Sequence, residues 1–270
     1  MQKRLIVAVV LLLVIVAGLI AYQSLREREP VYAGKSLRAW LREYDGSWPR
    51  STAAEAAIRQ IGTNAIPTLL KILCEKNSIS TSKLGDFWGR HISRHRSLPT
   101  WVRYPGWYLA LTGNRNSLAT VGFKVLGADA QQAVPALIQI YERNISPASQ
   151  QETSLSLIGI GPAGRVAIPS FLRGAASPNQ EVRRVAVVAL SALHAEPQLV
   201  VPALVKSLSD TNDVIRLMAV QGLQLFGPDA QQAIPAVVPL LTDSNLAVRL
   251  RAADALKAIS PEAAAGAGSK

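Results

Sequence analysis

Apolar residues recur with the same spacing around five prolines. Pro135, Pro169, Pro202 and Pro235 follow one another with a nearly constant period of about 33 residues, and Pro67 lies two such periods before Pro135. Apolar residues stand one position before each proline and two, three and six positions after it. This i, i+3, i+4, i+7 spacing is one face of an α-helix, and it puts the proline in the first turn, where its missing N–H is not needed. The residues at these positions are Ile66, Leu69, Leu70, Leu73; Val134, Leu137, Ile138, Tyr141; Ile168, Phe171, Leu172, Ala175; Val201, Leu204, Val205, Leu208; and Ile234, Val237, Val238, Leu241.

A further amphipathic helix is predicted before each of the later prolines. Its apolar face repeats with the same period as the prolines, with a small residue in the third place that predicts close helix–helix approach. Glycines after the helices, at positions 62, 127, 161 and 227, fit left-handed C-terminal caps. One helix pair cannot bury its apolar face alone, so neighbouring pairs must stack. The face consists of Val182, Ala186, Ala189, Leu190, Leu193; Ile215, Ala219, Gly222, Leu223, Phe226; and Val248, Ala252, Ala255, Leu256, Ile259.

The chain resembles HEAT repeats in the short bacterial form, which also occurs in phycobilisome lyases. The matching strings are "AIP.L...L" in the helix with the proline and "VRRVA" (182–186) and "VRLRA" (248–252) in the helix before it. The resemblance covers roughly 50–76 and 116–266, within an array expected over 50–266. It implies an all-α, right-handed α-solenoid of stacked antiparallel helix pairs. The patterns of tetratricopeptide and ankyrin repeats, which have similar periods, do not occur.

The N-terminal residues predict a membrane anchor. After "MQKR" comes an unbroken apolar run from Leu5 to Tyr22, which is long enough to nearly cross a hydrocarbon core of about 30 Å. The alternative is a cleaved signal peptide, but the run is longer than an ordinary one and has a poor cleavage site. We expect residues 1–25 to form a single transmembrane helix. The repeat domain is then expected on the exported, periplasmic side.

Residues 26–49 are expected to form a linker and a cap helix that covers the first repeat. Ser36 is its N-cap candidate, and Leu37, Trp40, Leu41 and Tyr44 share one face. The segment resembles a "GKxLxxWL" box that precedes HEAT-like repeats in membrane-anchored bacterial proteins. At the other end of the chain, residues 267–270 are expected to be a flexible tail.

Residues 78–115 interrupt the array, and much of the positive charge lies there. The net charge of the chain is +11, of which the near-neutral stretch 144–270 contributes only +1, whereas 83–115 alone contributes +5. Aromatic and arginine side chains together suit a binding surface for a protein partner or for anionic lipid headgroups. The alternative is a segment that packs on the repeats in place of a missing one. The candidate binding residues are Trp88, Arg90, Arg94, Arg96, Trp101, Arg103, Tyr104 and Trp107.

Catalytic, cofactor and metal sites are not expected. His91 and His95 are four residues apart and Cys74 could add a ligand, but a fourth ligand is missing and the neighbouring arginines repel a cation. Arg183 and its equivalents, Arg216 and Arg249, recur with the period of the repeats. They are expected to pair with Asp210, Asp213 and Asp243 of neighbouring repeats. The single cysteine excludes an intramolecular disulfide and does not fix the compartment.

Three functions are compatible with this pattern. The favoured one is a non-enzymatic, membrane-anchored scaffold that binds an unknown protein or peptide along the solenoid. An enzyme or chaperone like the HEAT-like lyases, acting on a protein substrate, is the first alternative, although a membrane anchor does not suit it. Nucleic-acid binding is the second alternative, and a near-neutral 144–270 and an exported domain disfavour it.

Overall fold

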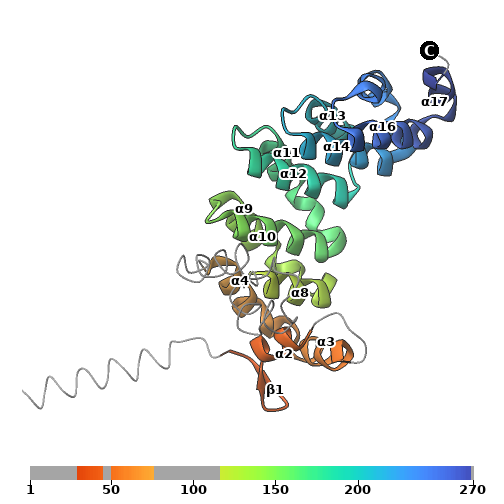
Figure 1. Ribbon diagram of the computed structural model, residues 1–270. Helices are drawn as coiled ribbons and strands as arrows, with labels where there is room; N and C mark the ends of the chain where they lie inside the picture. Colours follow the sequence, from red (N-terminus) through yellow and green to blue (C-terminus); the bar gives the residue numbers. More distant parts are fainter. Residues whose placement is uncertain (1–28, 45–49, 76–115, 269–270) are drawn as a thin grey trace, which may run out of the picture.

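The computed structural model describes residues 29–44, 50–75 and 116–268. Within them, helix pairs follow one another from a small N-terminal hairpin to a C-terminal helix (Figure 1). The elements are β1 Val31–Tyr32, β2 Lys35–Ser36, α2 Leu37–Glu43, α3 Arg50–Ile61, η1 Gly62–Ala65, α4 Ile66–Cys74, α8 Ser117–Leu126, η2 Gly127–Ala133, α9 Val134–Arg143, α10 Pro147–Gly159, η3 Gly161–Ala167, α11 Ile168–Ala175, α12 Gln180–Leu193, α13 Pro197–Ser207, α14 Asp213–Phe226, η4 Gly227–Ala233, α15 Ile234–Val237, η5 Val238–Thr242, α16 Leu246–Ile259 and α17 Pro261–Gly268. The predicted array of antiparallel helix pairs is confirmed; its superhelical handedness stays a prediction.

Each pair has a first helix and a second helix, and each kind lies on its own side of the array. The first helices α8, α10, α12, α14 and α16 pack on one another in sequence order, and α4, α9, α11 and α13 follow one another along the other side (Figure 1). The predicted apolar faces form one continuous core, in which Leu204 and Val237 are fully buried. Some residues of these faces are less buried: Ala175, Ile234 and Leu241 of the second helices and Val182 and Leu193 of α12 are partly buried, and so are most residues three positions after the proline. Leu70, Ile138 and their equivalents are only partly buried, and Val238 is exposed.

The helices on either side of the interruption are in direct contact. Helix α4 packs on α8, α9 and α10, so no layer of the array separates them. Asn116 donates from Nδ2 to the carbonyls of Ile72 and Leu73 at 2.7 and 3.0 Å, and Ser149 donates from Oγ to Leu73 at 2.6 Å. Two side chains from beyond the interruption therefore satisfy the last carbonyls of α4, which a helix end leaves without partners. Residues 75 and 116 lie side by side in the stack.

The links between first and second helices differ from the predicted tight turns. Gly62, Gly127, Gly161 and Gly227 all have positive φ, as predicted. At Gly127 and Gly227, however, ψ is about −130°, which is a glycine conformation outside the left-handed helical region. A 3₁₀ segment of four or seven residues then leads into the second helix. The predicted positive φ is thus confirmed at all four glycines. The predicted left-handed cap is wrong at Gly127 and Gly227.

Pro202 does not open its helix. The link before α13 is short because His194 and Glu196 both adopt left-handed conformations, with φ of 43° and 50°. Helix α13 therefore begins at Pro197, which takes the first-turn position, and Pro202 lies inside the helix. The other four prolines are at the first or second helical position, as predicted.

The N-terminal cap is a hairpin followed by a helix. Ser36 caps α2 by accepting from the N–H of Ala39, and Leu37, Trp40 and Leu41 are buried against the array, which confirms the predicted cap helix. The expectation of an all-α chain is wrong for residues 31–36, where β1 and β2 pair antiparallel across Ala33 and Gly34. Both turn residues have positive φ, the geometry of a two-residue hairpin loop.

The other predicted terminal segments have different outcomes. Helix α17 extends to Gly268, into the stretch 267–270 that was expected to be a flexible tail. It begins at Pro261, and Ser260 accepts the N–H of Ala263. None of the helices within 29–44, 50–75 and 116–268 is long and apolar enough to span a bilayer. The predicted anchor at Leu5–Tyr22 lies outside these ranges.

The recurring arginines join successive repeats. Arg183 binds both carboxylate oxygens of Asp210 at 2.6 and 3.1 Å, and Arg216 binds those of Asp243 at 2.8 and 2.9 Å. The two aspartate side chains are only 8% exposed. The predicted structural pairing is confirmed for these two arginines. Arg249 instead donates to the carbonyls of Asp243 and Ser244, and Asp213 accepts from Asn245 rather than from an arginine.

We expect Asp243→Asn to destabilise the array by about 1–3 kcal/mol, because it leaves a largely buried guanidinium without its charged partner. The hydrogen bonds from Arg216 hold the pKa of Asp243 below its usual value. A lowered folded-state pKa means that this stabilisation is complete above the unfolded-state value of 3.8 and is lost as pH falls through the folded-state value. Urea unfolding at pH 7 and at pH 3 should therefore show a smaller difference between variant and wild type at pH 3.

The control for this change is Asp254→Asn. Asp254 lies 3.8 Å from Arg251 on α16 and its side chain is 48% exposed. Exposed pairs contribute little, so this variant should lose less than about 0.5 kcal/mol. Equal losses in the two aspartate variants would contradict the structural role of the Arg216–Asp243 pair.

Candidate functional site

The second helices share one exposed face, which we call the second-helix face. Three positions of each repeat define it: the proline, the residue after it, and the residue four after it. All five prolines are exposed. The residue after the proline is small or short in every repeat, and the residue four after it is exposed and mostly basic. The two sets are Thr68, Ala136, Ser170, Ala203 and Ala236, and Lys71, Gln139, Arg173, Lys206 and Pro239.

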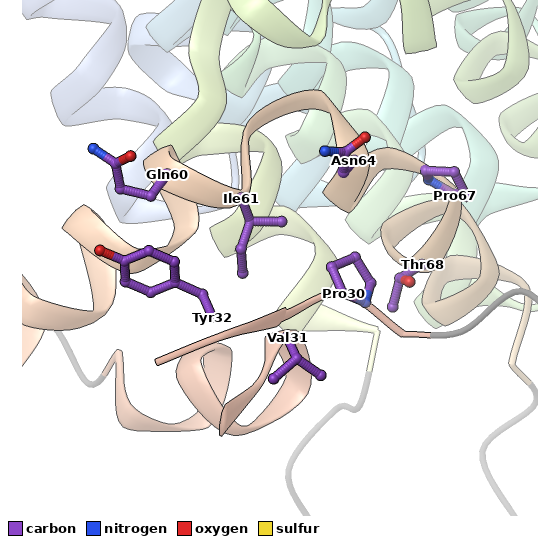
Figure 2. A pocket seen from close by; sticks show the side chains of 8 residues that line it. All are labelled: Pro30, Val31, Tyr32, Gln60, Ile61, Asn64, Pro67 and Thr68. Carbon is purple, nitrogen blue, oxygen red and sulfur yellow. The ribbon is translucent and has the colours of Figure 1, made fainter. Parts of the chain in front are cut away.

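The first hollow of this face lies at the N-terminal end of the array and has a volume of about 560 Å³. Figure 2 shows its lining, which comes from β1 and from the segment between the end of α3 and the start of α4. Pro30 and Ile61 give it an apolar part, and Tyr32 and Asn64 carry polar groups. Thr68, in the short-residue position, completes the lining.

The second hollow lies between α9 and α11 and has a volume of about 420 Å³. Its lining is polar. Glu142 of α9 accepts hydrogen bonds from Ser170 at 2.7 Å and from Arg173, both of α11. The hydrogen bond from Ser170 and the positive charge of Arg173 lower the pKa of Glu142. This carboxylate is therefore ionised at neutral pH, and it pairs with the basic residue of the next repeat.

The third hollow lies between α11 and α13 and has a volume of about 450 Å³. Leu172, Leu199 and Pro202 form the apolar part of its wall, and Leu199 is 52% exposed. The paired side chains of Arg183 and Asp210 belong to its polar part. Lys206 stands at its side, with Ala203 in the short-residue position. The short residue after the proline lines all three hollows, so they open on one face. In the second and third hollows the short side chain leaves space between successive second helices, whereas in the first hollow Thr68 faces β1 and the end of α3.

Tyr141 is one of the residues that line the second hollow. Its side chain is 3% exposed and packs edge-to-face on Phe171, with ring centroids 4.9 Å apart. Its hydroxyl has no hydrogen-bond partner among the described residues. Burial, with the nearby charge of Glu142, raises the pKa of Tyr141 to about 12.

We expect Tyr141→Phe to keep or raise stability at pH 7 by up to about 1 kcal/mol, because it removes a buried hydroxyl without a partner. Above pH 10 the unfolded tyrosine ionises while the folded one does not. A raised folded-state pKa means that wild-type stability is complete below the unfolded value and falls as pH rises toward 12, by about 2 kcal/mol. Chemical unfolding at pH 8 and pH 11 should show this loss in the wild type and a smaller one in Tyr141→Phe. Tyr32→Phe, at an exposed position, is the control and should behave as wild type.

The residues that the sequence singled out as candidate binding residues, from Trp88 to Trp107, lie outside the described part of the chain, as do His91 and His95. Their role stays a prediction. Cys74 is exposed at the end of α4. Within the described ranges, groups of three or more His, Cys, Asp or Glu side chains that could hold a metal ion do not occur.

Sequence reasoning missed two features of the site. The basic position four residues after the proline was visible in the aligned repeats but lay outside the apolar pattern. The polar character of α10 was missed as well. This helix lacks the "VR..A" string. Several of its buried side chains donate to backbone carbonyls, as Thr153 does to Ser149 at 2.6 Å, and Glu152 accepts from Thr120 of α8 at 2.6 Å.

Residues 201–267 match the family model described as HEAT repeats. This part of the array is similar to HEAT repeats. The predicted HEAT-like repeat domain is thereby supported at the C-terminal end of the chain. A comparison with curated proteins finds no match.

Several solved structures are similar to this chain. A designed armadillo repeat protein in complex with the peptide (KR)4 is 16% identical, with 84% of this chain and all of the other covered and a TM-score of 0.45. An engineered protein, structural genomics target OR497, is 17% identical, with 86% and 71% covered and a TM-score of 0.45. Identities and TM-scores at this level transfer neither a ligand nor an activity to the chain.

Proposed function

We propose that the protein is a non-enzymatic scaffold that binds a segment of another protein along the second-helix face. The observation that supports this most is the shared lining of the three hollows. Thr68, Ser170 and Ala203 occupy the same position of their repeats, and each lines one hollow. A surface that repeats from helix to helix suits an elongated ligand, because each repeat can contribute similar contacts.

Three of the less exposed charged pairs are engaged in holding the array together. Arg183 and Arg216 hold the inter-repeat loops through Asp210 and Asp243, and Arg38 of the cap helix binds Glu75 at the end of α4. These groups connect neighbouring elements of the array. The second-helix face also carries groups that can contact a ligand: exposed prolines, the hydroxyls of Thr68 and Ser170, the apolar part of the third hollow, and basic side chains.

A peptide selection tests this proposal. The full-length protein in detergent micelles is used to select binders from a library of random dodecapeptides. Ala203→Trp then fills the hollow between α11 and α13, and the selected peptides should bind this variant at least tenfold more weakly. Ala192→Trp, at an exposed position of the first helix α12, is the matched control and should bind as wild type. Selected peptides that bind both tryptophan variants equally, or a selection without enrichment, would refute the proposal.

We also propose that residues 5–22 hold the scaffold in a membrane, with the repeat domain on the exported side. The support is the length of the apolar run and its poor cleavage site. A C-terminally tagged protein should remain in the membrane fraction after carbonate extraction, and externally added protease should reach the repeats once the outer membrane is opened. A mature protein without its first twenty or so residues would show that the run is a cleaved signal peptide.

A further inference from the structure

We propose that helix α16 binds an aspartate of a partner protein, presented as Asp-x-Asn at the start of a helix. The site is one face of α16, near the C-terminal end of the array (Figure 1). We call it the end face and define it by Leu246, Arg249, Leu250 and Lys257. It is separate from the second-helix face, so the inference goes beyond the proposed function. Three observations carry it: two complete copies of the interaction within the array, a guanidinium edge without a carboxylate, and two exposed leucines.

The two complete copies show what an arginine at this position binds. In both copies Nη1 of the arginine donates to the backbone carbonyls that lie six and five residues before it. The opposite edge, Nε and Nη2, binds a carboxylate from the loop before the next first helix: Arg183 binds Asp210 and Arg216 binds Asp243. The carbonyls therefore hold each guanidinium in place while its other edge makes a bidentate pair.

The aspartate belongs to a short motif, Asp-x-Asn. Asp243 accepts the N–H of Asn245 at 2.8 Å, and Asn245 in turn caps α16 by accepting the N–H of Ala247 at 2.8 Å. The same bonds recur at 210–214, at 2.9 and 2.8 Å. The motif thus places a carboxylate directly before a helix. The sequence contains Asp-x-Asn only at these two places, and both are held by arginines of the same chain, so a second copy offers no free one.

Arg249 has the first half of this arrangement without the second. Its Nη1 donates to the carbonyls of Asp243 and Ser244 at 2.7 and 3.1 Å, again six and five residues before it. In the part of the chain that the structure describes, no carboxylate binds its Nε and Nη2. Lys257, exposed on the same face, makes no ion pair with the described residues either. The unbalanced charge of the end face is therefore positive, and a carboxylate is its complement.

Two exposed leucines lie beside this guanidinium. Leu246 and Leu250 are 58% and 59% exposed and are one helical turn apart. Their equivalents on α14, Asp213 and Leu217, are both partly buried, and α16 packs on α14. Asp213 also accepts from Asn245, which places this side of α14 against the next layer. The end face is thus the equivalent of a surface that a further layer covers.

The arginine and the leucines together select the occupant. The outer face of a terminal repeat is ordinarily polar, because it stays in water. A phosphate ester would fit the guanidinium edge but would leave the leucines in water. A helix that begins with Asp-x-Asn satisfies both, because its carboxylate binds Arg249 and its apolar side chains cover Leu246 and Leu250.

The test uses the chain's own motif as the probe. A labelled peptide with the sequence of residues 241–259 contains Asp-x-Asn and the helix that follows it. One variant peptide carries Asp243→Asn and another carries Asp254→Asn. These two variants have the same net charge, so a difference between them is not an effect of charge alone. Binding is measured on the full-length protein in micelles of an uncharged detergent.

Fluorescence anisotropy at low salt should show binding of the unchanged peptide with a Kd of about 1 mM or tighter. The Asp243→Asn peptide should bind at least about fivefold more weakly, because it loses the charge-assisted pair with Arg249. The Asp254→Asn peptide should bind within about twofold of the unchanged one, since exposed charges away from the contact contribute little.

Variants of the protein locate the contact. Arg249→Lys keeps the charge but removes the bidentate edge, so the two variant peptides should then bind within about twofold of each other. Arg251→Lys, at an exposed position of the same helix, is the matched control and should preserve the fivefold difference. Leu250→Ser should weaken all three peptides, whereas Leu225→Ser, at a 61% exposed position of α14, should weaken none. Urea unfolding checks the fold of each variant, and the comparison of peptides on the wild-type protein needs no variant.

The inference is wrong if the unchanged peptide does not bind at about 1 mM, if the two variant peptides bind alike to the wild type, or if Arg251→Lys acts as Arg249→Lys does. It is also wrong if light scattering shows a dimer that Arg249→Lys dissociates, because a second copy then covers the end face. The proposed function is judged separately. Ala203→Trp should leave binding of the 241–259 peptide unchanged; if it weakens that binding, the peptide lies on the second-helix face, and the scaffold proposal stands while the end-face site is wrong.

Discussion

Leu204→Ala is expected to lower the free energy of unfolding by about 2–5 kcal/mol. Leu204 lies on the buried side of α13 with 0% exposure and reaches the backbone of α14, where a Cβ at Gly222 would lie 2.9 Å from its Cδ1. Such close packing leaves little room for neighbouring groups to move into the space that a truncated side chain vacates. The loss should therefore include a cavity contribution in addition to the transfer free energy of the removed methyl groups.

Urea unfolding followed by circular dichroism measures this loss. Leu199→Ala on the same helix is the control, because Leu199 is 52% exposed and its truncation should cost less than about 1 kcal/mol. Val237→Ala tests the equivalence of the repeats, since Val237 occupies the same place in the next second helix and is also fully buried. A Leu204→Ala midpoint indistinguishable from wild type would mean that this face does not carry the core.

The part of the fold that could be predicted from the sequence is the part that the period specifies. A residue such as Leu204 recurs at the same place in each repeat because every second helix packs on the same kind of neighbours. The pairing of arginines with aspartates of the next repeat was predictable for the same reason. Arg183 and Arg216 each bind an aspartate that lies 27 residues later in the sequence. The match of residues 201–267 to HEAT repeats falls where this period is most regular.

The parts that could not be predicted are those where the chain departs from the period. At Pro202, two left-handed residues shorten the link and move the helix start to Pro197, and left-handed conformations of His194 and Glu196 have no clear sequence signal. The hairpin at 31–36 has only two residues per strand, too few to show an alternating pattern. The closure of the array across the interruption includes hydrogen bonds from Asn116 and Ser149 to the end of α4, which join residues 44 and 76 positions apart.

The candidate site was only partly accessible from sequence, for a related reason. The apolar pattern identifies which residues of a second helix are buried, and the remaining positions look like ordinary solvated surface. A hollow such as the one beside Lys206 exists because Ala203 is short and the neighbouring helix is at a particular distance. The distance between helices follows from the packing of both and cannot be read from either one alone.

The pair Gly174 and Tyr141 shows how neighbouring repeats adjust to each other. Gly174 stands five residues after its proline, where Ile72 and Ile140 stand in the two preceding repeats and are buried. A Cβ at Gly174 would lie 2.4 Å from the hydroxyl oxygen of Tyr141 and 2.9 Å from the Cβ of Ala186. The large ring of Tyr141 therefore occupies the volume that an isoleucine fills in those repeats.

Gly174→Ile is accordingly expected to destabilise the array by about 3 kcal/mol, because the interior is close-packed and the tyrosine ring cannot move aside without displacing Phe171. In a Tyr141→Leu background the same change should cost at least about 1.5 kcal/mol less, since leucine is the residue at the equivalent position of the first repeat, as Leu73. Urea unfolding of the wild type, both single variants and the double variant gives the interaction free energy between the two positions. Additive losses would contradict the compensation, and so would a single Gly174→Ile variant as stable as wild type.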